Sequence, residues 1–242
     1  MKLMAFSGRT VKEILRDPLN LFFGLGFPLV LLLLLSAIQS NIPVSLFEIQ
    51  GLAPGITVFG LSFMTLFSAT LLARDRESAF LQRLYTSPLK SFDFILGYML
   101  PIIPISMVQC AICYLVAIFL GLQITINILY AILIIIPAAI FHISLGLLCG
   151  SVFNVKQAGG ICGALVTNLS GWFSGIWFDL SLLGDFGKVA NLLPFAHAVE
   201  IEKAVINGNY ADIFPHIYWV LGYAVVTTII AILLFLRQMK KQ

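Results

Sequence analysis

The sequence predicts an all-α membrane protein with six transmembrane helices, and two observations support this fold class. Hydrophobic residues make up 60% of the 242 residues, while charged residues make up only 10%. The chain also contains six long apolar runs without a single Lys, Arg, Asp or Glu, at residues 19–38, 53–73, 94–120, 126–153, 159–178 and 213–236. Each run reaches the ~20 residues that a helix needs to cross the hydrocarbon core of a bilayer.

The distribution of charge predicts the orientation of these spans. Six spans place both termini on one side, where the segments hold 12 of the 14 basic residues and five acidic ones, a net charge of +7. The opposite segments hold Lys188, Lys203 and six acidic residues, a net charge of −4. Because cytoplasmic segments carry an excess of Lys and Arg, we expect a cell-membrane protein with both termini in the cytoplasm. The overall charge of +3 then reflects insertion and does not predict nucleic-acid binding.

The N-terminal segment, residues 1–18, is amphipathic. Its apolar residues fall in one half of a helical wheel: Leu3, Met4, Phe6, Val11, Ile14 and Leu15. Its charged residues cluster opposite: Lys2, Arg9, Lys12, Glu13 and Arg16. This pattern predicts an interfacial helix along the cytoplasmic leaflet, ending before Pro18, since Pro disfavours helical geometry in the residue before it. The alternative is a frayed terminus that only supplies positive charge. With charges spread through it and no cleavage site, we expect no removable signal.

The longest predicted cytoplasmic loop, residues 74–90, has helical spacing from Asp75 to Tyr85. Its apolar residues share one face: Phe80, Leu81, Leu84 and Tyr85. Its polar residues point away: Arg76, Gln82 and Arg83. The pair Ser87-Pro88 ends the pattern. Such a short amphipathic helix can lie on the membrane or insert its apolar face into a groove of a soluble partner, and the residues alone leave both readings open.

The large predicted external segment, residues 179–212, mixes acidic residues with apolar stretches. A disordered loop would carry fewer apolar residues. We therefore expect one or two short helices, broken near Pro194 and ending near Asn207-Gly208, that dip into the outer leaflet or pack on it. A surface loop without special role is the alternative.

The fifth apolar run carries small residues at every fourth position: Gly159, Gly163, Thr167, Gly171 and Gly175. Small residues let helices approach closely, which is the main route to helix association in lipid. This stripe is consistent with packing inside the chain, with a subunit interface or with the wall of a transport path. Asn168, on the adjacent face, has a side chain that could hydrogen-bond across such a contact.

Other candidate residues point to packing more than to chemistry. Four cysteines lie within predicted spans, where thiols behave as small apolar groups, so we predict no disulfide and no metal site. His142 is alone in the fourth run, and we expect a structural, hydrogen-bonded role for it. The chain has no phosphate-binding G-x-x-x-x-G-K-[ST] motif and no hydrolase motif. We therefore predict no enzyme activity and no cofactor, so a partner must supply the energy for any active transport.

The order and spacing of these features resemble the membrane subunit of an ABC exporter of the ABC-2 (type V) class. The resemblance covers nearly the whole of residues 1–242, as a single transmembrane domain. It rests on Leu15-Arg16-Asp17-Pro18 after the amphipathic start, on the loop from Arg76-Glu77 to Ser87-Pro88-Leu89, and on the stretch from Asn191 to Val199 before the last span. Ala79-Phe80 stands where the family usually has Gly-Thr.

The resemblance implies a dimer of membrane subunits, identical or different, driven by two separate ATP-binding subunits. It also implies that the predicted cytoplasmic helix couples to the ATPase, through Arg76, Glu77, Phe80, Leu81, Arg83 and Leu84. Residues 179–212 would form re-entrant helices, and spans two and five would line the path. A path without fixed charge suits an apolar or amphiphilic substrate, such as a drug, lipid or hydrophobic peptide.

Two other function classes compete with this reading. A self-contained secondary transporter or channel would need no ATPase, but the apolar runs lack the ionisable residues that ion coupling would use, and the sequence lacks two similar halves. A membrane enzyme would need nucleophiles, bases or metal ligands clustered at one depth, and the apolar runs show no such cluster.

Overall fold

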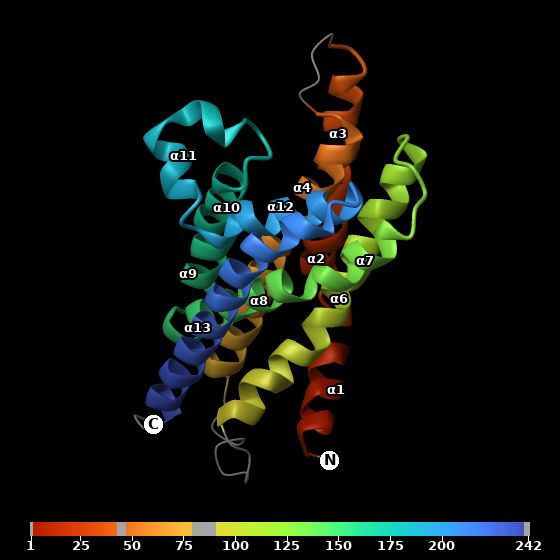
Figure 1. Cartoon of the computed structure of the whole chain (residues 1–242). Coiled ribbons are helices and arrows are strands. Elements are labelled where there is room, and N and C mark those ends of the chain that lie inside the picture. Colours follow the sequence, from red (N-terminus) through yellow and green to blue (C-terminus); the bar gives the residue numbers. More distant parts are fainter. Residues whose placement is uncertain (1, 43–46, 79–90, 240–242) are drawn as a thin grey trace.

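The computed structural model of the chain describes residues 2–42, 47–78 and 91–239, and these residues form helices and no strand (Figure 1). In chain order the helices are α1 (Lys2–Leu15), α2 (Pro18–Leu21), η1 (Phe22–Gly26), α3 (Phe27–Gln39), α4 (Ile49–Glu77), α6 (Ser91–Phe119), α7 (Asn127–Ile134), α8 (Ile136–Val152), α9 (Val155–Gly160), η2 (Ile161–Val166), α10 (Thr167–Phe173), η3 (Leu180–Leu183), α11 (Asp185–Ala190), α12 (Pro194–Ile206), η4 (Tyr210–Asp212) and α13 (Ile213–Met239).

Five helical stretches among the described residues are long and apolar enough to cross a membrane: Pro18–Gln39, Ile49–Glu77, Phe92–Phe119, Asn127–Val152 and Tyr210–Gln238. They coincide with five of the six predicted runs, so the all-α prediction is confirmed and the chain is a multi-pass membrane protein. Both termini lie at one end of the bundle, and α11 lies at the opposite end (Figure 1).

The remaining run, residues 159–178, is not among these five stretches. Its residues belong to a helical segment that begins with α9, passes through the π-helical turn η2 and ends with α10 at Phe173. The segment begins earlier than predicted because Asn154 caps it, accepting a 2.8 Å hydrogen bond from the backbone N–H of Gln157. It also ends earlier, and Gly175 in the following turn has a φ of +74°, which favours glycine.

Helix α4 is the centre of the bundle. In its most apolar 18-residue window 94% of the residues are buried, compared with 22–56% in the other four candidate spans. The closest neighbour is α8, and glycine makes the approach possible. A Cβ atom at Gly150 would lie 2.5 Å from the backbone oxygen of Ala69, and one at Gly146 would overlap the backbone of Thr65. The hydroxyl of Ser68 uses this proximity to donate to the backbone oxygen of Ile143 at 3.1 Å.

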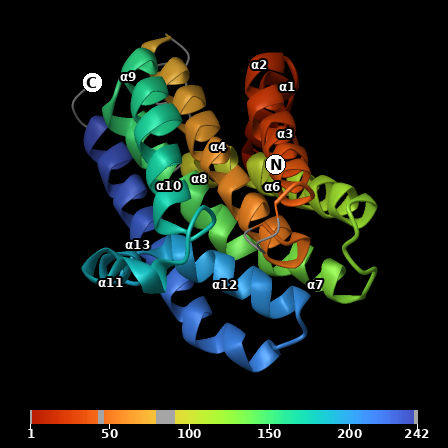
Figure 2. The ribbon, with the colours of Figure 1, turned by 90° about the horizontal axis from the view of Figure 1, so that it is seen from above.

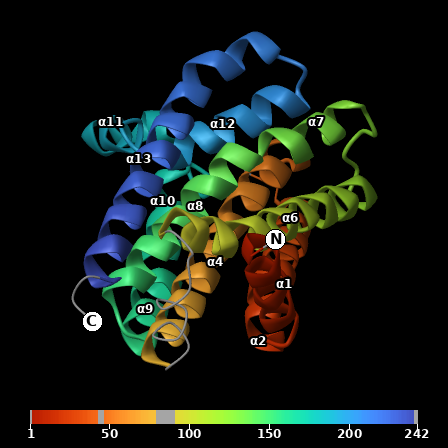
Figure 3. The same ribbon diagram turned by 90° about the horizontal axis from the view of Figure 1, so that it is seen from below.

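Two helices depart from the direction of the bundle. Helix α1 packs on its outside against the start of α6, where Phe6 meets Phe94 and Tyr98 edge-on at 5.9 and 5.0 Å between ring centroids (Figure 3). Helix α12 crosses from α10 towards α7 and packs on α4 and α13 (Figure 2). The breaks of the chain near Pro194 and after Ile206, where Gly208 has a φ of +76°, agree with the sequence pattern.

Candidate functional site

The candidate functional site is the last turn of α4, where residues 74–77 are four consecutive charged residues: Arg74, Asp75, Arg76 and Glu77. The sequence pattern placed the start of a separate cytoplasmic helix at Asp75, and this boundary is wrong. Helix α4 continues through Glu77, and Ser78 then adopts an extended conformation with φ −87° and ψ 154°. The four side chains make contacts with other helices that hold this turn in place.

Asp75 joins α4 to both α1 and α6. Its carboxylate accepts a hydrogen bond from each terminal nitrogen of Arg9 at 2.8 Å and one from the Tyr98 hydroxyl at 2.6 Å. Asp75 is only 2% exposed, so its charge needs these donors. Arg9 also lies 2.8 Å from Glu13, whose pKa is raised by burial and by the nearby Asp75.

Arg76 and Glu77 bind the two sides of the turn between α8 and α9. The guanidinium of Arg76 donates to the backbone oxygens of Gly150 at 2.7 Å and Phe153 at 3.2 Å. The carboxylate of Glu77 accepts from the backbone N–H of Val155, the first residue of α9, at 2.9 Å. A cation at a helix C-terminus and an anion at a helix N-terminus both match the direction of the helix dipole.

Arg74 completes the set with a 3.2 Å contact to Asp17, between α1 and α2. Its side chain is half exposed, so this pair contributes little stability. The charged turn is therefore connected to α1, α6, α8 and α9 at once, and it forms the beginning of the predicted coupling loop, residues 74–90. The other predicted coupling residues, Phe80, Leu81, Arg83 and Leu84, lie outside the described residues.

The small-residue stripe lies against α4 at three of its five positions. A Cβ atom added at Gly159 would lie 4.0 Å from the Thr70 side chain, and one added at Gly163 would lie 3.4 Å from the Leu66 side chain. Further along, a Cβ atom added at Gly171 would lie 3.2 Å from the Phe59 ring and 2.6 Å from the Trp177 indole nitrogen. The two helices therefore run antiparallel with this stripe between them.

The remaining stripe residues have other surroundings. Thr167 is buried and donates to the backbone oxygen of Cys162 at 3.0 Å. Gly175 lies beyond α10 in the turn already described. Asn168 is exposed on another face of α10, where its amide donates to the backbone oxygen of Ala164 at 2.7 Å.

A buried carboxyl group that the sequence pattern missed lies on α12. Glu202 is 1% exposed, and its Oε2 accepts from the Tyr114 hydroxyl of α6 at 2.6 Å, while its Oε1 has no hydrogen-bond partner among the described residues. Burial raises the pKa of Glu202 to about 8. The sequence did contain a signal for this burial. Glu202 lies four residues after Ala198 and three after Val199, so on a helix it shares their apolar face.

The histidines are engaged in hydrogen bonds. The Thr65 hydroxyl contacts both the backbone oxygen of His142, at 2.9 Å, and its Nδ1, at 3.1 Å, as a structural role requires. His197 of α12 donates from Nε2 to the backbone oxygen of Asn191 at 2.9 Å, and its Nδ1 lies 2.7 Å from Nδ1 of His216. Partial burial lowers the pKa of His197. The described residues contain no group of three potential metal ligands.

Comparisons with known proteins place these features in a family. The family model for the ABC-2 type transporter matches residues 1–206. A protein of Pyropia yezoensis named transport permease ycf38 is 27% identical over 241 residues, which cover 90% of this chain and 79% of that protein. Its namesake from Cyanophora paradoxa is 30% identical over 148 residues, covering 56% of this chain and 51% of that protein. No solved structure matches the chain.

Proposed function

Because the chain belongs to the ABC-2 type transporter family, we propose that this transport permease is the membrane subunit of an ATP-driven exporter. In this proposal the permease is not itself an enzyme, and ATP is hydrolysed by a separate ATP-binding subunit in the cytoplasm. The cargo is an apolar or amphiphilic molecule, such as a drug, lipid or hydrophobic peptide, because the apolar runs carry no fixed charge.

The observation that carries the proposal is the charged turn at the end of α4. A force on the loop after Ser78 reaches α1 and α6 through Asp75, and the turn between α8 and α9 through Arg76 and Glu77. These bonded contacts favour a loop that transmits motion over one that only covers the membrane surface.

The topology proposed with this function has six spans, with the segment from α9 to α10 as the fifth. The chain lies in the cell membrane, with α1 along the cytoplasmic leaflet, both termini inside and residues 179–212 outside as the re-entrant segment. The charge difference of +7 against −4 between the two sides supports this orientation.

We also propose a second membrane subunit, identical or different, against the exposed side of η2 and α10. Asn168 places an amide on that side, and Leu165 and Trp172 are 59% and 50% exposed. An exposed polar group in a span is costly against lipid alone, so a protein surface or a transport path is the more favourable surrounding.

Co-purification tests the ATPase partnership. Leu84→Asp places a carboxylate on the apolar face of the predicted coupling helix, which should cost several kcal/mol at an apolar contact. The variant should insert normally yet fail to retain the ATPase. Arg83→Ala, on the polar face, should weaken retention less. Undiminished recovery with Leu84→Asp at matched expression would remove this face as the docking surface.

Glu202 supports a second candidate, a self-contained secondary transporter. A buried carboxyl group beside Tyr114 is a group that proton coupling could use, and the apolar runs alone do not contain one. Transport by the permease and its ATPase in proteoliposomes separates the two candidates. The exporter requires ATP and tolerates a collapsed proton gradient, while the secondary transporter shows the reverse and loses transport in Glu202→Gln.

A further inference from the structure

A charged cavity of about 500 Å3 lies between α1, the turn into α2 and the end of α4. Four cations and two carboxylates line it: Arg9, Lys12, Arg16, Arg74, Glu13 and Asp17. The lining therefore carries a net charge of +2. Because the cavity lies beside the charged turn of α4, a molecule bound in it would lie next to the candidate functional site.

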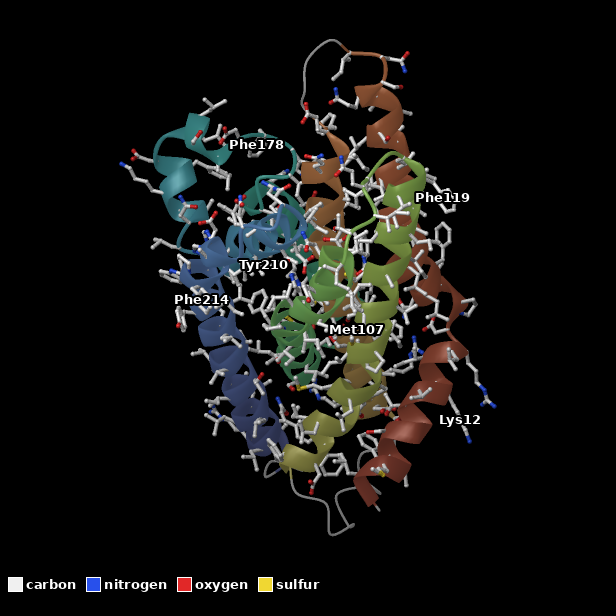
Figure 4. All side chains as sticks on the ribbon, turned by 45° about the vertical axis from the view of Figure 1, so that its right-hand side comes forward. Lys12, Met107, Phe119, Phe178, Tyr210 and Phe214 are labelled. Carbon is white, nitrogen blue, oxygen red and sulfur yellow. The ribbon has the colours of Figure 1, made fainter. Side chains whose placement is uncertain are left out.

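Only two of the four cations that line this cavity form an ion pair among the described residues. Arg9 is bound to Asp75 and Arg74 to Asp17. Lys12 and Arg16 are exposed and have no hydrogen-bond or ion-pair partner in the part of the chain that the structure describes. In Figure 4 Lys12 extends from α1 away from the bundle. Two cations at the mouth of the cavity are thus available to an anion.

Helix α1 has three faces, and they explain why a lipid is the fitting anion. Its buried face holds Phe6, Thr10 and Ile14 against the bundle. Its basic face lines the cavity. Its third face is apolar yet uncovered: Met4 is 80%, Leu15 63% and Val11 37% exposed. On a helical wheel this apolar face borders Lys12.

We propose that this cavity binds the phosphate head group of an anionic phospholipid, with Lys12 and Arg16 as the phosphate ligands and the acyl chains along Met4, Val11 and Leu15. The inference rests on the membrane-surface position proposed for α1 but not on export. A soluble phosphate would use the cations and leave the apolar face in water, whereas a phospholipid satisfies both. A protein partner would need an acidic and apolar surface together.

Native mass spectrometry of the purified full chain, titrated with phosphatidylglycerol and with phosphatidylcholine, tests the proposal. The wild type should bind phosphatidylglycerol more tightly. Lys12→Gln/Arg16→Gln should weaken phosphatidylglycerol binding about tenfold or more and leave phosphatidylcholine binding unchanged. Lys156→Gln is the matched control, because Lys156 is exposed, has no partner among the described residues and does not line the cavity. Lys12→Arg should retain binding.

Four results would overturn the assignment. The first is equal binding of the two lipids by the wild type. The second is an equal effect of Lys156→Gln and the double variant, which would reveal a general effect of charge. The third is displacement of phosphatidylglycerol by millimolar inorganic phosphate, which would identify a soluble anion as the ligand. The fourth is loss of ATPase retention without loss of lipid binding, which would assign the cations to a protein contact. If the double variant does not fold, the phosphatidylglycerol binding of Lys12→Gln and Lys12→Arg is compared instead.

Discussion

Asp75 accepts two hydrogen bonds from Arg9, both of 2.8 Å, and this pair joins the end of α4 to α1 across 66 positions of the sequence. The two partners differ in burial, since the Asp75 side chain is 3% exposed and the Arg9 side chain 33%. Losing Arg9 leaves a buried carboxylate with Tyr98 as its main donor. Losing the carboxylate leaves a guanidinium that water and Glu13 can still reach.

This asymmetry predicts unequal effects of the two neutralising substitutions. Arg9→Met should destabilise the folded protein by about 2 kcal/mol or more, because an unpaired buried charge is costly. Asp75→Asn should cost less, since the amide oxygen still accepts from Tyr98. Thermal unfolding in detergent measures both, with Lys156→Met as an exposed control. A larger loss for Asp75→Asn than for Arg9→Met would contradict the assignment of the buried partner.

A second prediction concerns how the sign of the charge at the start of α9, at Glu77 and Lys156, affects stability. Glu77→Lys places a cation near the N-terminus of α9, where Glu77 now accepts from the Val155 N–H, and should cost about 1 kcal/mol. Glu77→Gln keeps an oxygen acceptor and should cost less. Lys156→Glu, in the first turn of the same helix, should be neutral or slightly stabilising. Thermal unfolding of the three variants gives this order, and equal losses would show that the helix end is insensitive to charge.

The spans could be located from the sequence because a charge in hydrocarbon is costly wherever it falls. Arg16 and Asp17 precede the stretch that begins at Pro18, and Arg74 follows the run within α4. The same logic could not define where α4 ends. Charged residues leave the hydrocarbon but do not stop a helix, so α4 continues through Glu77 with each side chain bound to a neighbour.

The contacts of the candidate site lay beyond sequence reasoning for a related reason. Arg76 donates to the backbone oxygens of Gly150 and Phe153. Every residue has such an oxygen, so the residue types could not indicate these two partners. Glu202 was assigned to an external segment because it is charged, yet helix α12 turns it inward onto Tyr114. The repeat of small residues was visible, but only the packing shows that Gly163 and Gly171 face α4.

Glu202 predicts a pH dependence of stability. It lies on α12, outside the five candidate spans, and burial raises its pKa to about 8 from an ordinary value of 4.5. Below pH 4.5 the group is protonated in both the folded and unfolded states, so its contribution is fully present. Between 4.5 and 8 the unfolded chain binds fewer protons, so stability falls as pH rises and the contribution is lost through about pH 8.

The variant Glu202→Gln tests this sign, because the amide resembles the protonated acid and does not titrate. Wild type and variant should be similar in stability near pH 5, and the variant should be more stable near pH 8.5, by on the order of 3 kcal/mol. Glu200→Gln, two residues away and exposed, is the control and should not reproduce the difference. Thermal unfolding from pH 5 to 9 measures it. A constant gap between wild type and Glu202→Gln across this range would contradict the buried, protonated state.

The small-residue stripe yields the last prediction, a graded response to adding one methyl group. At Gly171 the new Cβ would lie 2.6 Å from the Trp177 indole nitrogen and 3.2 Å from Phe59, two rings that already pack edge-on at 5.8 Å. At Gly163 it would meet Leu66 at 3.4 Å, and at Gly160, next to the stripe, it would meet nothing within 4 Å.

Replacing glycine by alanine in a helix gains about 1 kcal/mol from the backbone, while overpacking costs about 1–3 kcal/mol. Gly160→Ala should therefore be neutral or stabilising, Gly163→Ala near neutral, and Gly171→Ala clearly destabilising, since two aromatic rings must move. Thermal unfolding of the three variants in one detergent compares them with the same chemical change at each site. If Gly171→Ala were as stable as Gly160→Ala, the contact between α10 and α4 would be looser than these distances require, and the stripe would hold no close helix packing at that point.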